Sequence, residues 1–285
     1  MATPGQNLSE DIRRRVKCFR VLILGRANAG KTTILHKVCN TTEQPEIFDT
    51  RGQKASALYL DDGNLGAKSC RGAHNINCEM IFKSNTGFIF HDSCGFEAGG
   101  YAELQAVKNF IAQRAREKKL SEQLHVIWCC IPMDNPRPIT VTEHSFFSTV
   151  GTGKVPVVVV FTKMDALDTK EWMKIKKEMT LPLGDAMDQA RKNSLSIAKR
   201  IYSEQLCTMK YQPKGSVYMR DMNQDNTQCT DLLQETVSVL DDSNLRHILV
   251  STQQISIEIR INYALKECVI SNMHANGERN LSIVI

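Results

Sequence analysis

Short apolar runs recur along the chain, and each is bounded by Gly, Pro or polar residues. Runs of this length are typical of buried strands, whereas buried helices are longer. We expect strands at residues 19–24, 76–82, 88–91, 126–131 and 157–161, and a last short one at 217–219. The turn between the second and third strands would fall at Ser84–Gly87. The runs predict one six-stranded sheet.

Between the runs, apolar residues return every three or four positions, which is typical of helices with one buried face. Residues 40–72 are instead polar and rich in Gly, Asp, Asn and Thr, so we expect a long loop there. The expected helices cover residues 31–38, 101–119, 140–150, 169–208 (one or two helices, broken at Pro182–Gly184), 230–240 and about 244–270. Within the last segment, residues 255–261 alternate like a strand, but the apolar pattern beyond them favours a helix. Strands alternating with helices predict an α/β fold, with a mostly parallel sheet covered by helices on both faces.

The composition is that of an ordinary globular protein. Of the 285 residues, 42% are hydrophobic and 24% are charged, which is enough to bury a sizeable core. The net charge of +5 comes from short basic clusters with acidic residues nearby. We interpret them first as solvated faces, and second as a weak contact for RNA or anionic lipid.

The cysteines and the apolar stretches indicate the cellular compartment in which the protein is expected. Ten cysteines are scattered without a C-x-x-C pair, which suits a reducing environment. The N-terminus has no signal-peptide core, and the longest apolar stretches have the length of strands, too short to span a bilayer. We therefore expect a cytoplasmic protein with no transmembrane segment.

Residues 25–32 read Gly-Arg-Ala-Asn-Ala-Gly-Lys-Thr and directly follow the first apolar run. This fits G-x-x-x-x-G-K-[ST], the P-loop, in which backbone amides turn inward around polyphosphate. An ordinary glycine turn before a helix is the alternative. In the P-loop interpretation, Lys31 reaches the β- and γ-phosphates and the Thr32 hydroxyl ligates Mg²⁺. The expected nucleotide contacts are Gly25, Ala27, Asn28, Ala29, Gly30, Lys31, Thr32 and Thr33.

A second motif, D-x-x-G, follows the strand at 88–91 as Asp92-Ser93-Cys94-Gly95. A carboxylate at a strand end can hold Mg²⁺ through water, opposite the P-loop threonine, so we expect Asp92 to join Thr32 as a metal ligand. The amide of Gly95 can contact the γ-phosphate, and hydrolysis would remove this contact and release the loop. We therefore assign catalytic roles to Lys31 and Gly95.

The residue after Gly95 is Phe96, where a Ras-like pattern has a glutamine that orients the attacking water. Phenylalanine has no group for this task. Glu97 and His91 are alternative candidates, although a histidine just before a ligand aspartate is equally consistent with a structural role. We therefore expect slow hydrolysis, or hydrolysis that depends on a partner.

The third motif is Thr162-Lys163-Met164-Asp165, which fits [NT]-K-x-D after the apolar run at 157–161. The Asp165 carboxylate can accept hydrogen bonds from guanine N1–H and the 2-amino group, and adenine has neither donor. The Lys163 stem can lie along the base, and Thr162 stands where asparagine is commoner. The alternative is a polar strand end. Residues 215–220 stand where a final base-contacting loop is expected, but they lack the usual Ser-Ala-Lys.

Three motifs in this order, each after a strand, resemble the translation-factor-related class of GTPases, which includes Ras-like, Era-like and septin-like proteins. The resemblance covers about residues 19–220 and implies a three-layer G domain. In such a domain the sheet has one antiparallel strand, GTP binding depends on Mg²⁺, and two switch loops are mobile. More narrowly, residues 71–74, 91–99 and 131–134 look like a large group of G-domain proteins in mushroom-forming fungi.

The chain departs from the class pattern in its first switch and in its length. No threonine precedes the second strand to complete Mg²⁺ coordination, and Ser69 is the nearest hydroxyl. Arg71 is either an internal arginine finger or a surface charge. About fifty residues separate Asp165 from Ser216, more than in a minimal Ras-like domain. The expected organisation is a flexible segment 1–15, a G domain 16–240 with a helical insertion at about 166–215, and a helical extension 241–285.

The leading hypothesis is a GTP-binding molecular switch with Mg²⁺-dependent hydrolysis of GTP. The main alternative, motivated by Phe96, is a non-catalytic module that interacts or dimerises when GTP is bound. An ATP-using kinase or ATPase is a third interpretation, and an added RNA or ribosome contact is a fourth. The expected partners are a guanine nucleotide and either a second copy of the chain or an effector protein, with no DNA.

Overall fold

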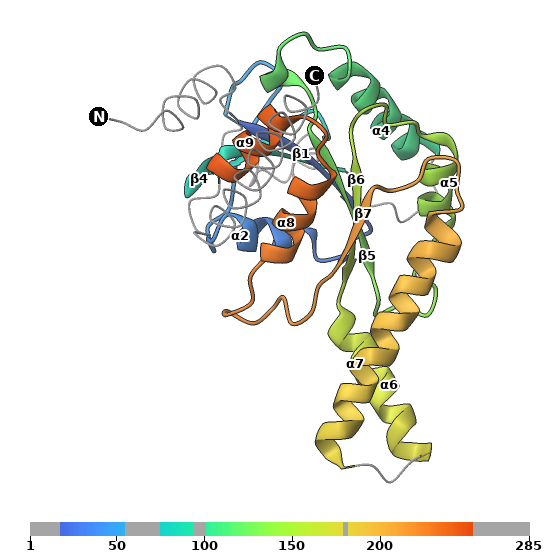
Figure 1. Ribbon diagram of the computed structural model, residues 1–285. Helices are drawn as coiled ribbons and strands as arrows, with labels where there is room; N and C mark the ends of the chain where they lie inside the picture. The colour runs from blue at the N-terminus through green and yellow to red at the C-terminus, as the bar shows by residue number, and fades with distance from the viewer. Residues whose placement is uncertain (1–17, 55–74, 94–100, 179–181, 253–285) are drawn as a thin grey trace, which may run out of the picture.

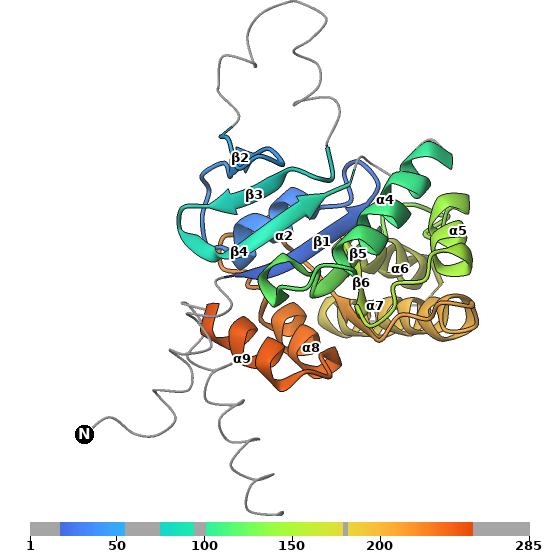
Figure 2. The same ribbon diagram turned by 90° about the horizontal axis from the view of Figure 1, so that it is seen from above.

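The computed structural model describes residues 18–54, 75–93, 101–178 and 182–252 (Figure 1). Within these residues, seven strands form one sheet, and Figure 2 shows its order from β2 across to β6. Strand β3 runs antiparallel to both of its neighbours, and all other pairs are parallel. In spatial order the strands are β2 (Glu46–Phe48), β3 (Glu79–Phe82), β4 (Asn85–Asp92), β1 (Phe19–Gly25), β5 (Val126–Pro132), β6 (Val157–Thr162) and β7 (Gly215–Tyr218).

The sheet confirms the mostly parallel arrangement with one antiparallel strand, but the prediction of six strands is wrong. The additional strand, β2, lies inside the segment 40–72 that we expected to be a loop. It has only three residues, all half-buried, and it pairs with β3, more than thirty residues away. Strand β4 begins earlier than predicted, at Asn85, because Asn85 pairs with Phe82 of β3, so the predicted turn at Ser84–Gly87 is wrong and the turn covers residues 83–84. The Asn85 side chain is buried, and its Nδ2 donates to Thr252 O at 3.1 Å.

Helices cover both faces of the sheet (Figure 1). One face packs against α2 (Lys31–Val38), α8 (Thr230–Val239) and α9 (Ser243–Thr252). The other packs against α4 (Tyr101–Arg114), α5 (Val141–Thr149) and the end of α7, and a single turn, η2 (Leu120–Glu122), precedes β5. No helix in the described residues combines the length and apolarity that crossing a bilayer requires.

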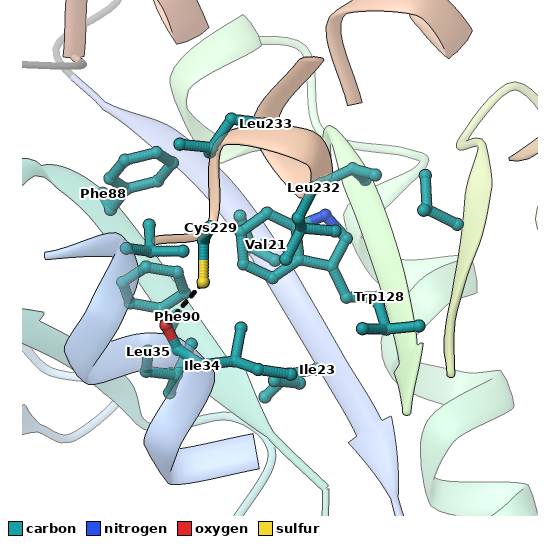
Figure 3. Close-up of a cluster of buried hydrophobic side chains, with 14 of the residues drawn as sticks. Val21, Ile23, Ile34, Leu35, Phe88, Phe90, Trp128, Cys229, Leu232 and Leu233 are labelled. Carbon is teal, nitrogen blue, oxygen red and sulfur yellow. Dashed lines mark hydrogen bonds between the residues drawn. The ribbon is translucent and has the colours of Figure 1, made fainter. Parts of the chain in front are cut away.

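The face under α8 buries Trp128 and several phenylalanines (Figure 3). Trp128 of β5 is fully buried, and its indole Nε1 donates to Thr236 Oγ1 of α8 at 3.1 Å, so burial leaves its polar atom satisfied. Cys229, just before α8, donates from its thiol to Ile34 O of α2 at 3.9 Å. These contacts fix α8 and α2 over the centre of the sheet, and thereby fix the start of α2 beside the end of β1.

Helix α9 packs on the same face as α8, with Ile248 and Leu249 buried in the shared core. The alternating residues 255–261, and the rest of the predicted helix beyond 252, lie outside the described residues, as does the segment 1–15. The division into 1–15, 16–240 and 241–285 stays a prediction.

Helices α6 (Met164–Glu178) and α7 (Leu183–Arg200) pack against each other and project away from the sheet as a hairpin, the α6–α7 arm (Figure 1). The predicted break into two helices is confirmed, but Leu183 and Gly184 belong to α7, so the break ends at Pro182 and does not cover the predicted Pro182–Gly184. A π-helical turn, η3 (Ile201–Leu206), continues α7. Helix α6 begins five residues earlier than expected. Asp165 in its first turn explains this, because a carboxylate there is favoured by the helix dipole.

Candidate functional site

The loop between β1 and α2 needs glycine at both ends. Gly25 has φ 147°, and a Cβ there would lie 2.7 Å from Cys130 O of β5. Gly30 caps α2 with φ 82°, in the left-handed region, although a Cβ would meet nothing closer than 3.8 Å. The first glycine is therefore required by a close approach of the backbone, and the second by its conformation.

Arg26 anchors this loop to helix α5. Its side chain is buried, and Nε donates to Glu143 Oε1 at 3.2 Å. Glu143 belongs to the capping box of α5, where its Oε2 also accepts from the backbone N–H of Thr140 at 2.6 Å. The charged residue of the loop thus faces α5, while Ala27 and Asn28 are exposed at the loop's outer surface.

The ammonium group of Lys31 lies across the mouth of the loop. Its Nζ donates to Gly25 O at 2.9 Å and to Arg26 O at 3.0 Å, and it is 3.8 Å from Asp92 Oδ1. The register of β1 and β4 places Asp92 opposite Ile23, directly beside the loop. The structure therefore brings together two predicted site residues, Lys31 and Asp92, from motifs sixty residues apart.

The start of α2 presents backbone donors. No side chain caps the helix at Gly30, so its first N–H groups need acceptors from outside the helix, and the dipole there favours an anion. Thr32 in the first turn is exposed, Thr33 is half-buried, and Ala29 of the loop is buried. Thr32 and Thr33 also line a cavity of about 790 Å³ that extends along α2 to residues 222, 223 and 225–230.

Thr162, at the end of β6, connects the third motif to the loop. Its side chain is buried, and Oγ1 donates to Ala29 O at 2.8 Å, across 133 positions of sequence. The threonine in place of the commoner asparagine therefore has a defined partner. This bond places the T-K-x-D segment next to the glycine loop at the same edge of the sheet.

Lys163 follows with φ 54°, an uncommon left-handed conformation for a lysine. Its Nζ donates to Asp134 Oδ2 at 2.7 Å, and Asp134 lies just after β5. Lys170 of α6 donates to Asp134 O at 2.7 Å, which fixes that turn against the arm. Asp134 belongs to the segment 131–134 noted for its resemblance, but sequence alone gave it no role.

Asp165 lies in the first turn of α6, and its Oδ1 accepts from the backbone N–H of Asp221 at 3.1 Å. Asp221 has φ 51° and belongs to the loop after β7. Residues 215–218 form the strand itself, so the contact comes one position after the predicted segment 215–220. Met164 donates its backbone N–H to Met219 O at 3.1 Å and fixes the two segments side by side.

His91 is not available to orient a water molecule, so that interpretation is wrong. It is fully buried, its Nδ1 lies 2.8 Å from Ile76 O, and its Nε2 lies 2.8 Å from Arg20 Nη1. Because arginine can only donate, Nε2 must accept, and the proton is on Nδ1, which donates to the carbonyl. Burial, helped by Arg20 and Arg114, lowers the pKa of His91 to about 3.

The remaining residues of the predicted switches, Ser69, Arg71, Gly95, Phe96 and Glu97, lie outside the described residues. Among those described, no three His, Cys, Asp or Glu side chains gather into a group that could hold a metal ion. Thr32 and Asp92 offer a hydroxyl and a carboxylate, which are oxygen ligands suited to Mg²⁺ shared with phosphate and water. The residues present therefore fit the metal only together with a nucleotide. No protein-family model and no curated protein matches this chain.

Proposed function

We propose that the chain binds a guanine nucleotide together with Mg²⁺, and that it hydrolyses GTP slowly or with the help of a partner. The observation that carries the proposal is the hydrogen bond from Thr162 Oγ1 to Ala29 O. It joins a loop suited to phosphate to a segment suited to guanine, so a single nucleotide can span both.

The phosphate end of the site consists of the loop amides, the start of α2 and Lys31. At present the ammonium group of Lys31 is held by two backbone carbonyls. Phosphate oxygens carry charge, so they are stronger acceptors than carbonyls, and Lys31 would exchange these partners for the β- and γ-phosphates. Thr32 and Asp92 would hold Mg²⁺, which neutralises charge between those phosphates when it is bound.

The base end consists of Asp165, oriented by the N–H of Asp221, and the stem of Lys163, oriented by Asp134. A carboxylate oxygen that accepts one hydrogen bond has a second lone pair, so both oxygens of Asp165 can still accept from guanine. Adenine offers no donor at N1 and no 2-amino group. It would leave the carboxylate unpaired, at a cost of roughly 1–3 kcal/mol.

In the reaction, water attacks the γ-phosphorus, the bond to the β-phosphate oxygen breaks, and GDP, inorganic phosphate and a proton are released. The chain contributes positioning and charge neutralisation through Lys31 and the loop amides. Position 96, after the D-x-x-G segment, is a phenylalanine and cannot orient the water. This is why we propose a slow intrinsic rate.

The test is equilibrium binding of fluorescent GDP with Mg²⁺, competed by GTP and by ATP, for the parent and for Asp165→Ala. We expect strong competition by GTP, weak competition by ATP, and loss of that preference in the variant. Asp231→Ala is the matched control, because Asp231 is an exposed first-turn carboxylate of α8. It should behave like the parent. Equal competition by ATP in the parent, or an unchanged Asp165→Ala variant, would refute guanine recognition by this segment.

A further inference from the structure

Arg220 and Asp168 form an ion pair in the base of the α6–α7 arm, next to the proposed guanine-binding segment. Arg220, two residues after β7, donates from Nε to Asp168 Oδ2 at 2.7 Å and from Nη2 to Asp168 Oδ1 at 3.3 Å. Asp168 is in α6 and only 4% exposed. The two bonds form a fork that fixes the plane of the guanidinium against the carboxylate.

The second helix of the arm completes the cluster. Ser194 of α7 is fully buried, and its Oγ donates to Asp168 Oδ1. Arg220 Nη2 also lies 3.3 Å from Ser194 Oγ and 3.5 Å from the carbonyl oxygen of Arg191. Both helices of the arm therefore hold the same arginine.

This cluster closes a ring of contacts around Asp165. Asp165 and Asp168 are three residues apart on α6, so they lie one turn apart along the helix. Arg220 contacts Asp168, and the next residue, Asp221, donates its N–H to Asp165 Oδ1. Asp165 is thus connected to Arg220 in two ways, through the turn of α6 that leads to Asp168 and through the hydrogen bond from Asp221.

A net gain in stability does not explain such a cluster well. Asp168 is buried, whereas the Arg220 side chain stays 24% exposed. Taking the carboxylate out of water costs free energy that its attraction to the arginine only partly returns, so the pair is weak evidence of stabilisation. Its geometry, however, restricts the loop after β7 to one position relative to α6. The Asp165 carboxylate needs such a fixed position if it is to accept hydrogen bonds from two donors of one base.

We propose that Arg220, held by Asp168 and Ser194, is a positioning residue that sets the guanine specificity of Asp165. The α6–α7 arm is thereby part of the base site, although neither helix beyond the first turn of α6 need touch the nucleotide. The inference rests on the proposed function, because it presupposes that Asp165 reads a guanine base.

The test compares GDP with inosine diphosphate, which lacks only the 2-amino group that Asp165 would accept from. For the parent we expect GDP to bind about tenfold or more tightly, the value of one hydrogen bond to a charged group. Arg220→Lys keeps the charge but cannot form the fork, and Ser194→Ala removes the hydroxyl. We expect each to lower the GDP preference by about threefold or more and to speed GDP release.

The affinity ratio and a control variant separate a loss of specificity from a loss of folded protein. The ratio of the two affinities within one variant does not depend on the fraction of folded protein, because both nucleotides meet the same folded molecules. Lys192→Gln removes an exposed charge from α7, the helix that carries Ser194, and should keep the parental ratio of the two affinities.

The inference is overturned if Arg220→Lys and Ser194→Ala keep the parental ratio and release rate while Asp165→Ala loses the preference. A parent that binds GDP no better than inosine diphosphate and ADP would instead overturn the proposed function, and the inference with it.

Discussion

Lowering the pH from 7 to 5 should destabilise the fold through His91. This residue is fully buried between β1, β3 and α4, with Arg20 on one ring nitrogen and the carbonyl of Ile76 on the other. The charged groups around it are Arg20, Arg114 of α4 and Glu79 of β3, and Glu79 pairs with Arg20 at 2.6 Å. A proton added to His91 would therefore be buried next to two cations.

The size of the effect follows from two pKa values. Burial lowers the pKa of His91 to about 3 in the folded state, whereas the unfolded chain takes up this proton below about pH 6.5. Between these values the unfolded state binds more protons, so the stability that is present at neutral pH is lost as the pH falls. Each pH unit in this window is worth about 1.4 kcal/mol, which gives roughly 2 kcal/mol between pH 7 and pH 5.

The assay is urea denaturation at pH 7, 6 and 5 for the parent and for His91→Gln, whose side chain does not titrate. We expect the parent to lose roughly 2 kcal/mol more unfolding free energy than the variant over this range. Burial also lowers the pKa of His125, to about 4, but that contribution is common to both proteins and cancels in the difference. Equal pH dependence in the two proteins would refute the assignment of a buried neutral imidazole at position 91.

Three further experiments test the loop between β1 and α2, its hydrogen bond to β6, and the mode of GTP hydrolysis. Gly25→Ala should lower the unfolding free energy by about 2 kcal/mol or more, because its Cβ would meet a β5 carbonyl oxygen at 2.7 Å. Gly153→Ala, also at positive φ but with nothing within 4 Å, should cost only about 1 kcal/mol, and equal losses in denaturation would contradict the clash. Thr162→Val should weaken GDP binding and cost about 1–3 kcal/mol, because Ala29 O loses its donor, whereas Thr162→Ser should behave like the parent. With Phe96 after the D-x-x-G segment, GTP turnover per molecule should rise with protein concentration if a second copy assists, and a constant low value over a dilution series would exclude that mode.

The site segments are predictable from sequence because each directly follows a buried strand. Parallel strands end at a common edge, so residues 25–32, Asp92 and 162–165 had to meet there once the strands were identified. Lys31 and Asp92 lie 3.8 Å apart, in agreement with this reasoning. Local sequence carries such information because the strand, the turn and the candidate site residue are within a few positions of one another.

The distant residues that contact these segments, or the helix that carries one of them, are harder to predict. Asp134, Ser194 and Asp221 form hydrogen bonds with residues 26 to 56 positions away, and each is an ordinary polar residue in its own neighbourhood. Strand β2 was missed for a related reason, since its three half-buried residues acquire a strand conformation only by pairing with β3. Short edge strands and distant hydrogen-bond partners of this kind depend on tertiary contacts. They produce no periodic pattern of apolar residues in the local sequence.

Within the described residues, both edge strands of the sheet, β2 and β7, have features that discourage further pairing. At one edge β2 has only three residues, and Glu46 within it is paired with Lys54 at 2.7 Å and with Lys83 at 3.5 Å. Short, charged edge strands discourage a second chain from adding a strand.

At the other edge, Ser216 of β7 donates its backbone N–H to Glu235 Oε1 of α8 at 3.2 Å. A side chain of the same molecule thus occupies a donor that a foreign strand would need, and Gly215 leaves it room to approach. We therefore expect two copies of the chain to associate through side-chain surfaces more readily than by extending the sheet. For the same reason the folded protein should resist growth into fibrous aggregates even when it is concentrated.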